Sequence, residues 1–261
     1  MLTIRVFSTM TKLRPFLVII LTIGIIGAAI LAIVKMQSRE CDNIQVTIHY
    51  EGESPSVTES DIIAMIKKSG VQVIGKKLKE IDFGEVSAAI AQNPFILQTN
   101  KIYFQKRSAV IDITLKKLLL HVYPLRGEQY YLDENGNFLP YSAKVRENLI
   151  IANGNITTQY KPNRRIGDKS MISSIFRIAK LIEKNEFYAA QFRQLYVNDQ
   201  NNIEIIPTLG KHIILFGDER NAAEKLFNLK ETYKNGLAYV GMDQYALLDV
   251  RYKNRVIAKK R

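Results

Sequence analysis

The chain has 261 residues, of which 47% are hydrophobic, so it can bury the core of one large domain or of two small ones. Its single cysteine, Cys41, excludes an internal disulfide, and one thiol cannot form a zinc site alone. The formal net charge is +12, but the basic residues are scattered in pairs such as Lys116-Lys117, without interleaved aromatic side chains. We therefore expect no nucleic-acid partner and favour a solvated basic surface, with anionic lipid headgroups or acidic wall polymer as its neighbours.

Residues 16–34 are the first distinctive segment, because they contain no charged side chain. As a helix this segment would span about 28 Å, close to the roughly 30 Å hydrocarbon core of a bilayer. A cleaved signal peptide is the competing interpretation. Its apolar region would be shorter, about 7–15 residues, and residues 36–39 lack the small-x-small cleavage pattern. We therefore expect a single N-terminal transmembrane helix at residues 16–34.

The charges beside this segment predict its orientation. The charged residues that precede it are all basic, whereas Lys35 and Arg39 after it are offset by Glu40 and Asp42. The side richer in Lys and Arg stays in the cytoplasm, so residues 1–15 are expected to form a cytoplasmic tail. The remainder of the chain would then lie outside the cytoplasm.

Residues 42–117 have the pattern of a small α+β domain. The alternation Ile44-x-Val46-x-Ile48 is typical of a strand, and Thr58 followed by Asp61 predicts the start of a helix. The expected elements are a strand at 44–48, helices at 58–70 and 82–92, and strands at 97–105 and 109–117. This β-α-α-β-β order would place two helices on one face of a three-stranded sheet.

Residues 118–261 predict a mixed, mostly antiparallel β domain with helices. Asn135-Gly136 between two apolar runs is a strong hairpin signal. Asp168 and Asp218 are placed as caps of the two helices. The expected strands are at 118–125, 129–132, 137–140, 148–152, 192–197, 203–207, 212–216, 245–252 and 255–258, and the expected helices at 169–184 and after Asp218 to about 234.

Catalytic motifs are missing from the sequence. It contains no G-x-S-x-G, C-x-x-C, H-E-x-x-H, P-loop or G-x-G-x-x-G pattern. His49, His121 and His212 are far apart in the sequence and each falls in or beside an expected strand. We therefore expect no catalytic, cofactor-binding or metal-binding residue, and a binding or scaffolding role rather than an enzyme.

Short motifs recur along nearly the whole chain. In the first domain they are Ile44-x-Val46-x-Ile48, Val57-Thr58-x-x-Asp61-Ile62, Gly75-Lys76-Lys77-Leu78, Ile90-x-x-Asn93-Pro94-Phe95-Ile96 and Val110-Ile111-Asp112-Ile113. In the second they are residues 130–140, Ile214-Leu215-Phe216-Gly217 and Leu248-Asp249-Val250-Arg251-Tyr252-x-Asn254-x-Val256. These motifs resemble the bacterial cell-division family FtsQ, also called DivIB. The resemblance implies a cytoplasmic tail, a transmembrane helix, a POTRA domain and a β domain. It also implies a single-pass protein of the bacterial inner (cytoplasmic) membrane, at the division septum, with its domains outside the cytoplasm.

Sheet edges suggest how such a domain binds its partners, because an edge offers unpaired N–H and C=O groups to another strand. The candidate is the strand at 245–252, where Ala246, Leu248, Val250 and Tyr252 would face the core. The resemblance implies that this region binds FtsB, within the FtsB–FtsL pair, alongside other divisome membrane proteins, so the protein would link early and late division proteins. The expected partner-binding residues are Tyr245, Leu247, Asp249, Arg251 and Tyr252.

Two other functions stay open at this point. A membrane-anchored, wall-active enzyme could use the basic loop at 161–165 to hold acidic polymer. A POTRA-bearing export or assembly factor could receive exported substrates. Fold alone does not decide among the three.

Overall fold

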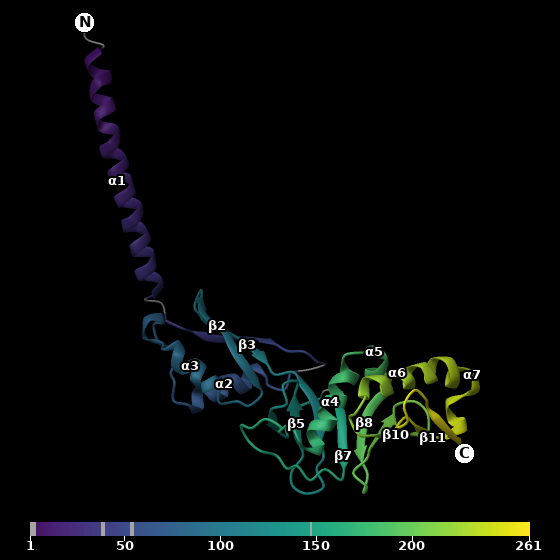
Figure 1. The fold of residues 1–261 in the computed structure, drawn as a ribbon. Coiled ribbons are helices and arrows are strands. Elements are labelled where there is room, and N and C mark those ends of the chain that lie inside the picture. Colours follow the sequence, from purple (N-terminus) through teal and green to yellow (C-terminus); the bar gives the residue numbers. More distant parts are fainter. Residues whose placement is uncertain (1–3, 38–39, 53–54, 147) are drawn as a thin grey trace. The chain divides into compact units, whose positions relative to one another are not determined.

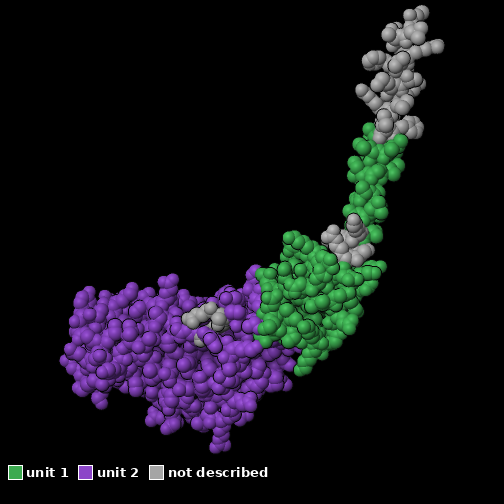
Figure 2. All heavy atoms as spheres, turned by 180° about the vertical axis from the view of Figure 1, so that it is seen from behind, with its two compact units in different colours: residues 1–47, 59–90, 99–113 green, residues 48–58, 91–98, 114–261 purple. Residues whose placement is uncertain are grey.

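The computed structural model describes residues 4–37, 40–52, 55–146 and 148–261, with the side chains of 4–17 and 35–37 outside the description. Figure 1 shows the elements of the chain, and Figure 2 shows its two compact units. Unit 1 comprises residues 1–47, 59–90 and 99–113, and unit 2 comprises residues 48–58, 91–98 and 114–261. The expected domains, residues 42–117 and 118–261, stay a prediction.

Helix α1 (Ile4–Gln37) runs through the apolar segment. Its described side chains include Ile20, Leu21 and Leu31, which are 65%, 66% and 71% exposed. Among the described residues, no helix combines the length and the apolar character that a membrane crossing requires. The side chains of the expected tail and of Phe16 and Leu17 lie outside the description, and the transmembrane helix stays a prediction.

The first globular unit contains the expected three-stranded sheet, and its β-α-α-β-β order is confirmed. The strand order is β1-β3-β2. Ile62 and Ile66 of α2 are buried, as are Val86 and Ile90 of α3, because their spacing places them on one side of each helix. The elements are β1 (Asn43–His49), α2 (Glu59–Lys68), η1 (Leu78–Glu80), α3 (Phe83–Ile90), β2 (Ile96–Gln105) and β3 (Ser108–Leu115).

The second unit is built on a large mixed sheet with the strand order β12-β11-β10-β9-β8-β7-β4-β5-β6. Parallel pairs join β4 to β7, β7 to β8 and β10 to β11, and the other neighbours are antiparallel. The strands are β4 (Leu118–Val122), β5 (Tyr130–Asp133), β6 (Phe138–Pro140), β7 (Ile150–Gly154), β8 (Phe192–Val197), β9 (Ile203–Pro207), β10 (Ile213–Gly217), β11 (Tyr245–Asp249) and β12 (Ile257–Lys260).

Helices pack on this sheet and share one core with it. Ile175 and Ile178 of α4 and Leu229 of α6 are fully buried in the same cluster as Leu195 of β8 and Ile205 of β9. The helices are α4 (Met171–Glu183), α5 (Glu186–Gln191), α6 (Ala222–Thr232), η2 (Tyr233–Leu237), α7 (Ala238–Val240) and η3 (Met242–Gln244). The fold class is therefore α+β with a large mixed sheet, as the sequence predicts.

The hairpin between β5 and β6 confirms the Asn-Gly signal. Asp133 is 1% exposed, and its carboxylate accepts hydrogen bonds from the backbone N–H groups of Asn135 and Asn137 at 2.9 and 2.8 Å. Gly136 has φ +80, which glycine adopts without steric penalty. The carboxylate therefore satisfies backbone donors that the tight turn leaves without ladder partners.

Both expected helix caps are wrong. Ser170, not Asp168, caps α4, because its hydroxyl accepts from the N–H of Ser173 and the Ser173 hydroxyl accepts from the N–H of Ser170. Helix α6 begins at Ala222, after Asn221 in a left-handed conformation, and the Asp218 carboxylate instead contacts Arg220 and Lys225. Each carboxylate precedes a short loop, so it lies too early in the chain to cap the helix.

Candidate partner-binding edge of the large sheet

The large sheet ends in two short strands, β6 and β12. Strand β6 has three residues and ends at Pro140, which has no N–H to offer a further strand. Strand β12 has four residues, all exposed, and its first residue, Ile257, is 45% exposed. Of the two edges, β12 is therefore the better template for an added strand.

The expectation that residues 245–252 form the open edge is wrong. Strand β11 lies between β10 and β12, with Leu248 opposite Ile214 on one side and Ala258 on the other. A helical crossover through α6 returns the chain parallel to β10, and the short turn after Asp249 then brings β12 along the remaining side. Strand β11 is thus paired with another strand along both of its edges.

A β-bulge changes which side chains of β11 face outward. Tyr245 pairs with Lys260 and Leu247 pairs with Lys259, so one extra residue of β11 lies between two consecutive pairs. Tyr245 consequently packs against the core cluster instead of facing outward with Leu247, as the uninterrupted alternation predicted. Leu248 and Val250 face the core as expected, at 0% and 1% exposure.

Two more of the expected partner-binding residues are placed differently from the prediction. Asp249 was expected to face outward but is 6% exposed, and Tyr252 was expected to face the core but is 45% exposed. The strand ends at Asp249, and the chain then turns, with Asn254 at φ 58, so alternation no longer sets the direction of Tyr252. The guanidinium of Arg255 lies over the Tyr252 ring, 5.5 Å from its centroid.

The end of β11 is fixed by an ion pair. Nη2 of Arg251 donates to Oδ2 of Asp249 at 2.6 Å, and Nε donates to Oδ1 at 2.9 Å. Hydrogen bonds from Arg251 hold the pKa of the Asp249 carboxyl below its ordinary value, against the opposing effect of burial. The N–H of Val250 donates to the carbonyl of Leu215 at 3.1 Å, which ties the same segment to β10.

A buried lysine supports the edge from the β10 side. The Lys225 ammonium on α6 donates to the carbonyls of Phe216 and Asp218 at 3.0 and 2.8 Å. Burial lowers the pKa of Lys225, and Asp218 opposes that shift. Beside it lies a cleft of about 330 Å³, lined by Asn202, Gly217, Asp218, Arg220, Asn221, Lys225 and Arg251. The basic side chains that line this cleft already bind carboxylates or carbonyls of the chain. We therefore assign them a structural role.

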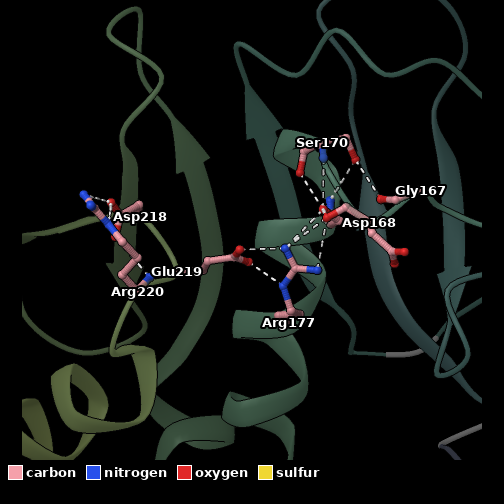
Figure 3. Close-up of polar contacts among 8 residues, drawn as sticks. Gly167, Asp168, Ser170, Arg177, Asp218, Glu219 and Arg220 are labelled. Atoms are coloured by element: carbon pink, nitrogen blue, oxygen red, sulfur yellow. Dashed lines mark hydrogen bonds and ion pairs between the residues drawn. The ribbon is translucent and has the colours of Figure 1, made fainter.

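A second ion pair joins α4 to the loop between β10 and α6. Figure 3 shows Arg177 reaching across to Glu219, with Nε to Oε2 at 2.5 Å and Nη2 to Oε1 at 2.6 Å. The same guanidinium donates to the Asp168 carbonyl and, at 3.3 Å, to the hydroxyl of Ser173. The loop that leads to α6 is thereby fixed to the helix that covers the core.

The hydrogen bonds at the end of the chain show which backbone groups β12 presents outward. The N–H of Arg261 donates to the carbonyl of Gln244, next to β11, at 3.1 Å, and its guanidinium donates to the carbonyl of Lys211 at 2.6 Å. In an antiparallel ladder, hydrogen-bonded and non-hydrogen-bonded pairs alternate. The pairs at Ala258 and Lys260 are therefore the non-hydrogen-bonded ones, and their N–H and C=O groups point away from β11.

The three histidines have separate surroundings. Nε2 of His121 lies 2.9 Å from Oε1 of Gln129, and Nε2 of His212 lies 2.5 Å from the hydroxyl of Tyr233. Burial lowers the pKa of both His121 and His212. His49 is exposed at the end of β1. Within the described residues, no three His, Cys, Asp or Glu side chains gather as they would around a metal ion.

The fold and its edge define a class of protein: a small α+β domain joined to a larger domain with a mixed sheet, whose exposed edge suits binding to another chain. Comparison with known families agrees with this class. The family described as "FtsQ/DivIB, C-terminal related" matches residues 119–259, and the POTRA-like domain matches residues 39–115. The chain belongs to the FtsQ/DivIB family. No curated protein matches it.

Family membership supports a role in cell division, with divisome proteins as partners and the division site as the place of action. FtsQ/DivIB and POTRA-like domains are generally non-enzymatic. The sequence predicts both final strands, but we did not expect β12 to form the open edge. Two strands joined by a short turn pair with each other, so the second strand was bound to cover one side of the first.

Proposed function

We propose that this protein is a non-enzymatic, membrane-anchored scaffold of the divisome that links early and late division proteins at the septum. Family membership supports the divisome role. The sheet supports the binding role, because β12 ends it with four exposed residues. That open edge is the single observation on which the proposal depends.

The anchor of this proposal is the segment at residues 16–34, with the N-terminus in the cytoplasm and the globular part outside. Its described apolar side chains are exposed on all sides of the helix, as shown by Ile20, Leu21 and Ile26, which point in three different directions around the helix axis and are 65%, 66% and 58% exposed. A helix that is apolar on all sides needs an apolar environment on all sides. A bilayer supplies that environment, and the basic residues before the helix favour the cytoplasmic side for its start.

The partner of this proposal is the FtsB-like protein, within its pair with an FtsL-like protein, which would add a strand to β12. Backbone hydrogen bonds supply affinity in this mode, and alternate side chains supply specificity. Leu247, Arg251 and Tyr252 would contact the partner beside the edge. Tyr245 and Asp249 would support the edge without contacting the partner, because Tyr245 packs against the core and Asp249 forms an ion pair with Arg251.

A proline on the open side of β12 tests this mode. Ala258→Pro removes an N–H that points away from β11, which an edge strand tolerates, and leaves the β11–β12 hydrogen bonds in place. Ala258→Val is the matched control, because it keeps the N–H and favours a strand. We expect Ala258→Pro to reduce co-purification of the FtsB-like and FtsL-like proteins about tenfold, and Ala258→Val to leave it unchanged.

The proposal is contradicted if Ala258→Pro recovers both partners at the wild-type level while its Tm stays within about 2 °C of wild type. Depletion of the protein in cells gives a second readout. Under the proposal, depleted cells become long and unseparated, and the wild-type chain but not Ala258→Pro restores division. Loss of exported β-proteins with normal septation would instead favour an assembly factor.

A further inference from the structure

The segment that leads into the open edge is strongly basic. Residues 251–261 contain no Asp or Glu, and Asp249 just before them is taken up by Arg251. The Arg261 guanidinium is held by the carbonyl of Lys211. The basic residues of this segment are Arg251, Lys253, Arg255, Lys259, Lys260 and Arg261.

Two of these cations lie on the edge strand itself, on opposite faces of the sheet. Lys259 lies opposite Leu247 on the outward face, whereas Lys260 lies opposite Tyr245, which packs against the core side. A strand added to β12 would bring its own side chains within about 4.5–5.5 Å of these residues on both faces. A lysine or arginine there would be repelled, and a carboxylate would be attracted.

We propose that the segment which adds to β12 is acidic, with Glu or Asp on both faces opposite Lys259 and Lys260. This inference rests on the proposed function and names the chemistry of its partner. A protein strand fits better than a lipid headgroup or wall polymer for two reasons. The edge offers outward N–H and C=O groups at Ala258 and Lys260, and Ile257 adds an apolar contact that is 45% exposed.

The charges would act on both the rate and the strength of binding. Complementary charges steer the encounter and raise the association rate, and added salt screens that effect. Each exposed ion pair contributes roughly two- to fivefold to affinity. The two lysines together therefore account for about a tenfold change in Kd, while the backbone pairing supplies the remainder.

The test measures Kd for the full chain in detergent micelles. The probes are the extracytoplasmic segment of the FtsB-like protein from the same genome and a version whose pairing strand has Gln and Asn in place of Glu and Asp. The protein variants are Lys259→Gln/Lys260→Gln and a control with the same change of charge on α2, Lys67→Gln/Lys68→Gln. We expect the edge variant to raise Kd about tenfold for the acidic segment and less than twofold for its amide version, and the α2 variant to change neither.

Three outcomes would overturn the inference. The FtsB-like pairing strand could carry no acidic residue, or the amide version could bind as tightly as the acidic one at about 50 mM and about 500 mM salt. Alternatively, the edge variant could lose binding to phosphatidylglycerol vesicles and keep its affinity for the acidic segment, which would assign the basic edge to lipid. In each case Ala258→Pro distinguishes the two proposals. If Ala258→Pro still weakens binding of the segment about tenfold, strand addition holds and only the charge proposal fails. If Ala258→Pro leaves Kd unchanged, strand addition itself fails.

Discussion

Arg251 and Asp249 form a two-pronged ion pair where β11 ends, with Nη2 to Oδ2 at 2.6 Å and Nε to Oδ1 at 2.9 Å. The pair lies within one turn of chain, so it fixes the direction in which the chain leaves the strand. The backbone N–H of Arg251 also donates to Oδ1 at 3.1 Å. The position of β12 depends on this turn, because the next residues lead directly into the edge strand.

Replacing Asp249 with Asn removes the charge of this pair and keeps the shape of the side chain. Arg251 lowers the pKa of Asp249 in the folded state. The ion pair therefore contributes fully to the free energy of unfolding above the unfolded-state pKa of about 3.9, and this contribution is lost as the pH falls through the folded-state pKa. We expect Asp249→Asn to lower the free energy of unfolding at pH 7 by on the order of 1 kcal/mol and to flatten its dependence on pH below about 4. Chemical denaturation at several pH values measures both effects, and an unchanged acid dependence would contradict them.

The Arg177–Glu219 pair joins α4 to the loop before α6, so its loss should loosen that loop. Both side chains are partly exposed, at 45% and 31%, so the pair contributes only about 1 kcal/mol. We expect Arg177→Met to destabilise unit 2 by about that amount. Amide exchange should become faster in the loop formed by Asp218, Glu219 and Arg220. The control is Arg220→Met, whose 85% exposed side chain should leave stability unchanged. Equal effects of the two substitutions would contradict the assignment.

Gly154 lies where no side chain fits. A Cβ at this position would be 2.2 Å from the carbonyl oxygen of Val197 on the neighbouring strand, and the residue has φ +93. We expect Gly154→Ala to cost at least about 2 kcal/mol, because clash and backbone strain add. Gly167→Ala is the matched control, since nothing lies within 4 Å of its Cβ and its φ is not in the left-handed region. Thermal unfolding of both variants measures the difference, and a Tm equal to wild type for Gly154→Ala would refute the close contact.

His212 should make the stability of unit 2 depend on pH. Burial lowers its pKa in the folded state, so the unfolded chain binds a proton first as the pH falls. The free energy of unfolding therefore has its full value above the unfolded-state pKa of about 6.5. Below that pH it declines, by at most about 1.4 kcal/mol per pH unit. His121 contributes in the same direction, because burial lowers its pKa too.

The variant His212→Gln separates the two histidines. It has no titrating group, so we expect its unfolding free energy to fall less steeply between pH 7 and pH 5 than that of wild type, with the remaining slope due mainly to His121. The hydrogen bond to the Tyr233 hydroxyl would be weakened, so the variant should also be less stable at pH 7. Parallel pH dependences for the two proteins would contradict the role of His212.

Much of the fold follows from local patterns in the sequence. The alternation at Ile44-x-Val46-x-Ile48 and the Asn135-Gly136 turn correctly predict β1 and the β5–β6 hairpin, because strand period and turn chemistry are local. The resemblance to the FtsQ/DivIB family is confirmed over residues 119–259. The caps of α4 and α6 were predicted wrongly, because several polar residues precede each helix and loop geometry decides whether one of them reaches the backbone, as Ser170 does at α4.

The candidate site was less predictable from the sequence than the fold. Which side chains of β11 face outward depends on a bulge between Tyr245 and Leu247. The extra residue reverses the alternation of faces that the sequence pattern predicts. The burial of Asp249 depends on its pairing with Arg251, which hydropathy does not reveal. The open edge depends on the order of strands in the sheet, which is a long-range property.

Residue-resolved amide hydrogen exchange, with and without the FtsB-like partner, is the most direct test of strand addition to β12. In the free chain, the N–H groups of Lys259 and Arg261 face β11 and should exchange slowly, whereas those of Ala258 and Lys260 should exchange fast. We expect binding to protect the N–H groups of Ala258 and Lys260 at least tenfold and to leave exchange at the β6 edge unchanged. Tight binding of the partner with no added protection at Ala258 and Lys260 would show that it binds elsewhere.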